Sequence, residues 1–277
     1  MPATTLAARV LAALLVTCSC GCLYFSTERQ ISYGLTHYEM GLYEQAIPPL
    51  MTAARSLEKE SPPDPRLVDV LIALGTMAVS EERNDLAGDF FARALKAAEA
   101  LRPADERRLR NALVNLGMFY AQDDRRPREA IPLLERAAAI SSGYGDRELY
   151  AIDLDNLGFA CQQAGMYAEG SKHSLEALAV IETVSTGSER EKTRGVILHN
   201  LAMSYAGEGR NAEAEERFRQ SVAVLESAPG VEPWRLETAR HSYAEFLRRT
   251  GRAKEARELE SRWKGARSSE PGPHPAD

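Results

Sequence analysis

A repeat of about 42 residues constrains this chain more than any other feature of its sequence. A large side chain followed by a small one recurs six times, at Tyr33-Gly34, Leu74-Gly75, Leu116-Gly117, Leu157-Gly158, Leu201-Ala202 and Tyr243-Ala244. The small residues are separated by 41, 42, 41, 44 and 42 positions. Six copies in register predict one structural unit that is repeated along the chain.

Each repeat contains two apolar stripes at helical spacing, and in four repeats the stripes are separated by a glycine: Gly41, Gly165, Gly209 or Gly251. A second small residue follows the first by about twelve positions in every repeat, as Ala46 follows Gly34. Small residues on both helices allow two backbones to approach closely, and large residues between them fill the remaining space. The pattern therefore predicts an antiparallel helical hairpin.

Three segments carry the repeat most clearly: Asn115-Leu-Gly-Met-Phe-Tyr120, Gly165-Met-Tyr-Ala-Glu-Gly170 and Gly41-Leu-Tyr-Glu-Gln-Ala46. They resemble the tetratricopeptide repeat, whose pattern is Leu-Gly-x-x-Tyr, then Gly-x-Tyr, then Ala. Two departures are visible. Leucine stands where the family has an early tryptophan, and the period exceeds the usual length of about 34 residues. The longer period, with Asn before Leu-Gly, is similar to the kinesin-light-chain type of this repeat.

This resemblance implies an all-α fold, a right-handed superhelical solenoid of about six helical hairpins over residues 30–263. The predicted units are about 30–64, 65–103, 105–142, 147–186, 189–229 and 233–263. Residues 264–277 are polar and contain three prolines, so we expect a disordered tail.

Residues 1–25 differ in composition from the rest of the chain. Arg9 is their only charged residue, and residues 10–25 are 16 positions without a charge. That run is shorter than the roughly 20 residues of a membrane-spanning helix. The apolar stretch 10–16 has the length of a signal-peptide core, and Cys18, Cys20 and Cys22 follow it.

A cysteine directly after such a stretch resembles the lipobox of bacterial lipoproteins, in which the thiol is acylated and the peptide is cut just before it. Ser19 before Cys20 and Gly21 before Cys22 both provide the small residue that this cleavage needs. We predict that residues 1–19 are a signal peptide and that Cys20 is the lipidated mature N-terminus. The protein would then be tethered to the cell envelope, facing the periplasm. A plain cleaved signal peptide, giving a secreted protein, and an uncleaved anchor are the alternatives.

Composition and motifs argue against several functions. The 34 basic and 40 acidic residues give a net charge of −6, without the basic stripe expected of a nucleic-acid-binding protein. The sequence has no phosphate-binding loop, His-Glu-x-x-His or Gly-x-Ser-x-Gly motif. The closely spaced cysteines and scattered histidines do not match a zinc site. We therefore expect no enzymatic activity, cofactor or metal.

Three asparagines mark the candidate binding surface. Asn115, Asn156 and Asn200 each precede the large–small pair in three consecutive repeats. Asparagine is unfavourable inside a helix, so its recurrence suggests a use for the carboxamide, which offers one acceptor and two donors. In the kinesin-light-chain-like repeats that this chain resembles, Asn at this position lines the concave groove and binds the main chain of the ligand. Hydrogen bonds between helices, or simple solvation of the amide, are the alternatives.

Other side chains at helical spacing are predicted to line the same groove: Met118, Phe159, Gln162, Gln163, His199 and Met203. We therefore predict a non-catalytic adaptor that is tethered to the envelope and binds a peptide segment of a partner protein in this groove. The alternative is a lipoprotein subunit of a larger secretion or assembly complex, with contacts through the convex face or the ends of the stack. Charged residues around Trp263 suggest that the last hairpin is a solvated cap.

Overall fold

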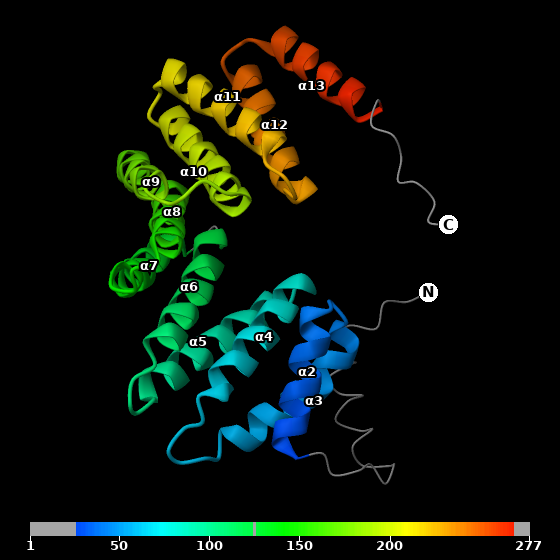
Figure 1. Cartoon of the computed structure of the whole chain (residues 1–277), viewed down its shortest axis with the longest axis vertical. Coiled ribbons are helices and arrows are strands. Elements are labelled where there is room, and N and C mark those ends of the chain that lie inside the picture. The colour runs from blue at the N-terminus through cyan, green and yellow to red at the C-terminus, as the bar shows by residue number, and fades with distance from the viewer. Residues whose placement is uncertain (1–25, 124–125, 269–277) are drawn as a thin grey trace. The chain divides into compact units, whose positions relative to one another are not determined.

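A computed structural model describes residues 26–123 and 126–268, and within these ranges the chain forms twelve α-helices and no strand (Figure 1). The helices form consecutive hairpins, as the repeat predicts. The proposed signal peptide and Cys20 lie outside the described residues. The structure divides at Tyr120 into two compact units, a first unit up to that residue and a second unit from Ala121 onward.

Helix bounds follow the repeat closely. The helices are α2 (Thr27–Glu39), α3 (Tyr43–Leu57), α4 (Arg66–Ser80), α5 (Asn84–Ala100), α6 (Glu106–Gln122), α7 (Pro127–Ser142), α8 (Arg147–Gln163), α9 (Tyr167–Ile181), α10 (Ser188–Gly207), α11 (Asn211–Ser227), α12 (Pro233–Arg249) and α13 (Ala253–Ser268). The last helix extends five residues into the segment that was predicted to be disordered. Proline first occurs in that segment at position 271, so nothing before it prevents the helix from continuing.

The small residues of the repeat lie where two helices approach most closely. A Cβ atom on Gly158 of α8 would lie 2.8 Å from Ser174 Oγ and 3.0 Å from the carbonyl oxygen of Gly170, both on α9. In the first unit, a Cβ atom on Gly75 would lie 2.5 Å from the ring of Phe91. The repeated glycine is therefore required by packing between the two helices of a hairpin.

The turns between paired helices share one backbone conformation. Gly165 and Gly209 have φ angles of 75° and 77°, in the left-handed region that glycine adopts without steric cost. The next amide closes the turn on the preceding helix, as Met166 N–H donates to the Cys161 carbonyl at 2.8 Å. In the α4–α5 turn Glu82, with φ 58°, takes the corresponding place.

Aromatic side chains of α11 and α12 form part of the core of the second unit. Phe218 is fully buried, and its ring centroid lies 5.7 Å from that of Tyr243 and 5.3 Å from that of Phe246. Trp263 of α13 is half-buried and packs against the same core.

Substituting Gly158→Ala should lower the stability of the second unit. The added methyl group meets the backbone of α9, which has no rotamer with which to move away, so we expect a loss of about 1–3 kcal/mol. Gly143→Ala is the control, because its Cβ atom would approach nothing closer than 3.5 Å. Urea unfolding followed by circular dichroism measures both, and equal midpoints for the two variants would contradict the packing argument.

Candidate functional site

The three predicted asparagines lie near the middle of α6, α8 and α10, the first helices of their hairpins. Asn115 belongs to the first unit, and Asn156 and Asn200 to the second. Within the second unit α8 packs against α10, so the structure brings these two asparagines onto neighbouring helices. We define the α8–α10 face by the side chains that share their helical register: Ile152, Asn156, Phe159 and Gln163 of α8, and Val196, Asn200 and Met203 of α10.

The three carboxamides have different surroundings. Asn115 donates from Nδ2 to the carbonyl of Asn111 in its own helix, at 2.8 Å. Asn200 donates from Nδ2 to Oδ2 of Asp155 on α8, also at 2.8 Å. The half-buried Asn156 makes no side-chain hydrogen bond within the described part of the chain. Of the three, only Asn156 therefore has both its Oδ1 acceptor and its whole Nδ2 donor group without a partner in the described residues.

Asp155 lies at the junction of three helices. Its side chain is buried, and it accepts hydrogen bonds from Asn200 of α10 and, at 3.3 Å, from Ser174 Oγ of α9. Burial raises the pKa of this carboxyl group to about 7, and the two hydrogen bonds only partly oppose that rise. Asp155 is therefore a buried link between helices.

His199 lies on the far side of Asn200 from Asp155. Its Nδ1 is 3.3 Å from Asn200 Oδ1, and its ring meets the ring of Phe218 edge-on at a centroid distance of 6.1 Å. The Nε2 atom is buried without a hydrogen-bond partner. Burial lowers the pKa of the imidazole to about 4, so the ring is neutral. His199 is therefore half-buried, with its Nε2 atom covered and its ring against Phe218.

The remaining predicted groove residues divide into two groups. Gln163 is exposed, and Met118, Phe159 and Met203 are half-buried. Gln162, in contrast, is only 9% exposed, and its Oε1 atom is buried without a partner. Its neighbour Cys161 is buried, and burial raises the pKa of its thiol to about 11. Helical register alone placed Gln162 too far toward the groove.

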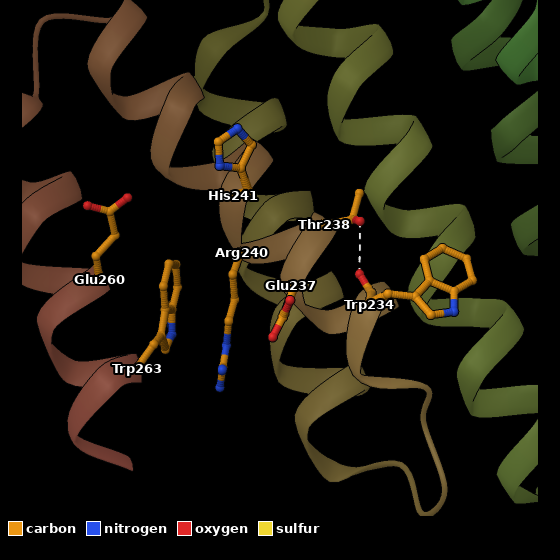
Figure 2. Close-up of a pocket in the computed structure, with 7 residues that line it drawn as sticks. All are labelled: Trp234, Glu237, Thr238, Arg240, His241, Glu260 and Trp263. Carbon is orange, nitrogen blue, oxygen red and sulfur yellow. Dashed lines mark hydrogen bonds between the residues drawn. The ribbon is translucent and has the colours of Figure 1, made fainter. Parts of the chain in front are cut away.

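A surface pocket lies at the last hairpin, where the sequence predicted only a solvated cap (Figure 2). Its volume is about 560 Å³. It is lined by Trp234, Glu237, Thr238, Arg240, His241, Glu260 and Trp263. Both tryptophans of the chain are in this pocket, which is the signal that could have revealed it.

Contacts within the protein occupy the charged groups of this pocket. The Arg240 guanidinium pairs with Glu226 at 2.7 Å and lies 5.4 Å from the centroid of the Trp263 ring. Glu260 pairs with Arg248 at 2.6 Å. These interactions join α11, α12 and α13, so the pocket's polar groups stabilise the last hairpin.

Residues 26–123 and 126–268 contain neither a candidate metal centre nor a membrane-spanning helix. No group of three or more His, Cys, Asp or Glu side chains there could hold a metal ion. No helix of the described residues is long and apolar enough to cross a membrane.

Comparisons with known proteins agree with this geometry. The model of the tetratricopeptide repeat family matches residues 108–183 and 154–227. No curated protein sequence matches the chain.

Solved structures with the same fold cover most of the chain. BtubC (BKLC) from P. vanneervenii is 21% identical with a TM-score of 0.61, over 91% of this chain and 95% of that one. A kinesin light chain protein of nearly identical TPR-like repeats from Podosopora anserina is 22% identical with a TM-score of 0.57, over 75% and 99%. A Rap protein complexed with competence and sporulation factor is 13% identical with a TM-score of 0.59, over 85% and 75%.

Replacing the buried acid should change how stability depends on pH. With a pKa of about 7 in the folded chain and 3.8 as its ordinary value, Asp155 binds more proton in the folded state between pH 4 and 7. The folded state therefore loses stability as the pH rises through this window. In Asp155→Asn the neutral amide can still accept from Asn200, so its stability relative to the natural chain should rise from pH 5 to pH 8, by up to about 2.7 kcal/mol.

Urea unfolding of both chains at the two pH values measures this difference. His199 is present in both proteins, so its own titration cancels. Glu182→Gln, at an exposed acid after α9, is the control and should show no such trend. The assignment fails if the advantage of Asp155→Asn is the same at pH 5 and pH 8.

Because the family model matches them, residues 108–227 carry tetratricopeptide repeats. The helices before and after them continue the same series of hairpins.

Proposed function

We propose that this protein is a non-catalytic adaptor that binds an extended peptide segment of a partner protein on the α8–α10 face. Tetratricopeptide repeats are typically protein-interaction modules, and the Rap protein with a similar fold was solved with competence and sporulation factor bound. The observation that carries the proposal is the unpartnered carboxamide of Asn156. A carboxamide can donate to a peptide carbonyl and accept from a peptide N–H, and it can do both whatever the peptide's side chains.

The surroundings of Asn156 suit such a ligand. Phe159 and Met203 offer apolar surface that is only half-buried, and exposed Gln163 adds a second carboxamide two helical turns from Asn156. The hydrogen bond from Asn200 to Asp155 fixes the position of α10 relative to α8. The face is thus prepared before a ligand arrives, which reduces the entropy lost on binding.

Substituting Asn156→Ala should weaken peptide binding without unfolding the protein. A phage-displayed library of random, unstructured peptides is the probe, and peptides selected on the natural chain are then titrated against each variant. Loss of two hydrogen bonds to the peptide main chain should weaken the affinity about tenfold or more. Asn211→Ala, which removes an exposed carboxamide from α11, is the control and should bind normally. Selected peptides that bind both variants equally would refute the proposed face.

We also propose that Cys20 carries a lipid that holds the protein on the cell envelope. The support is its position after an apolar stretch of signal-peptide length, with Ser19 before it. Two or more acyl chains provide stable attachment where one is marginal.

Substituting Cys20→Ala should abolish lipid attachment. Bacteria that express the full chain are labelled with an alkyne fatty acid, and the label is detected on the purified protein. Cys22→Ala is the matched control and should retain the label. Labelling that survives Cys20→Ala but is lost in Cys22→Ala would move the site, and an unlabelled natural chain would exclude acylation.

A further inference from the structure

The first hairpin exposes a large residue that the later hairpins bury. Tyr33 occupies the large position of the repeat and is 51% exposed, whereas its counterparts Leu74, Leu157 and Leu201 are exposed by 3% or less. No described helix precedes α2, and so no hairpin covers Tyr33 in the described part of the chain.

Tyr33 belongs to a stripe along α2, which we call the uncovered face of α2. Arg29, Tyr33 and Met40 follow one another at helical spacing, and Met40 is 65% exposed. The ring of His37 stacks on that of Tyr33 at a centroid distance of 3.8 Å. Leu42, in the turn after the helix, is also exposed. The face therefore presents a stacked aromatic pair and two apolar side chains to its surroundings.

The other end of the stack differs. Terminal repeats of a solenoid normally turn a polar face outward, and α13 does so with exposed Lys254, Arg257 and Glu258. The uncovered face of α2 lacks this protection. Its apolar side chains indicate that another apolar or amphipathic surface covers it.

The chain before α2 indicates which surface that is. Residues 21–25 are the five positions between the proposed lipid anchor at Cys20 and Ser26, which caps α2, so six residue steps separate the two. Six extended residues span at most about 20 Å, and a helix of 13 residues is itself about 20 Å long. A lipid on Cys20 would thus hold α2 within its own length of the bilayer.

We propose that the uncovered face of α2 lies on the lipid headgroups beside the anchor. This inference rests on the proposed acylation of Cys20. The amphipathic ring of Tyr33 suits the boundary between headgroups and acyl chains, Met40 and Leu42 enter the apolar edge, and Arg29 meets lipid phosphates. The first hairpin then contacts the membrane through this face of α2.

A tryptophan introduced at position 33 tests this contact. The acylated full-length Tyr33→Trp chain is reconstituted into vesicles of phosphatidylethanolamine and phosphatidylglycerol, with and without brominated acyl chains that quench nearby tryptophan. The natural chain, whose Trp234 and Trp263 lie in the last hairpin, gives the background. Val79→Trp is the matched control, because Val79 is an exposed apolar residue of the same unit at the end of α4.

We expect brominated lipid to cause a loss of emission in Tyr33→Trp that is absent from the natural chain and from Val79→Trp. A Tyr33→Trp chain that floats with the vesicles but is not quenched overturns the lipid contact and leaves the anchor intact. Blue-shifted emission without quenching would mean that protein, either a second copy or the preceding residues, covers the face. A chain that does not float with vesicles overturns the contact together with the anchor, and peptide binding on the α8–α10 face is then judged separately.

Discussion

The close approach of α8 and α9 at Gly158 and Gly170 is the constraint on which the second unit depends. The two backbones are too near for any side chain between them, so the helices lock at one distance and register. That register places Ser174 of α9 beside Asp155 of α8. Asp155 then accepts a hydrogen bond from Asn200 of the next hairpin. One packing contact within a hairpin thus determines a polar contact between hairpins.

This polar contact decides which asparagine can serve a ligand. Asn200 holds α10 against α8 with its Nδ2 group, and its Oδ1 faces His199. Neither titratable group beside it has an opposite charge as partner, and Asp155 is buried while His199 is half-buried. Desolvation therefore favours the neutral form of each, by raising the pKa of Asp155 and lowering that of His199. The junction is therefore a hydrogen-bonded link with no ion pair. Asn156, one residue beyond Asp155, makes no side-chain hydrogen bond within the described residues.

The fold was predictable because the same pattern of small and large residues, which sets the packing of a hairpin, recurs in six repeats. Small residues such as Gly158 and Gly75 mark close packing between paired helices, against backbone at Gly158 and against the Phe91 ring at Gly75. Turn glycines such as Gly165 mark a left-handed backbone conformation. The site was only partly predictable. Helical spacing gives only the approximate direction in which a side chain leaves its helix. That range of directions includes both the predicted groove and the interface between neighbouring helices. Gln162 and His199 each have a polar atom that is buried. Asn200 bonds to a neighbouring helix because Asp155 is there to accept, and Asp155 lies one residue before the repeated asparagine position of α8. The pocket at Trp234 and Trp263 lies on the last described hairpin and is formed by residues outside the repeated positions, so the repeat pattern did not predict it.

The side-chain amides of Asn156 and Asn200 differ in their hydrogen bonding, and NMR measures the two separately. Exchange of the side-chain NH₂ protons with water can be followed at Asn156 and Asn200 in the folded chain. We predict slow exchange at Asn200, because Asp155 accepts its hydrogen bond, and fast exchange at Asn156, which slows when a selected peptide is added. Equal exchange at the two residues, or protection of Asn156 in the free protein, would contradict the assignment of Asn156 as the recognition residue.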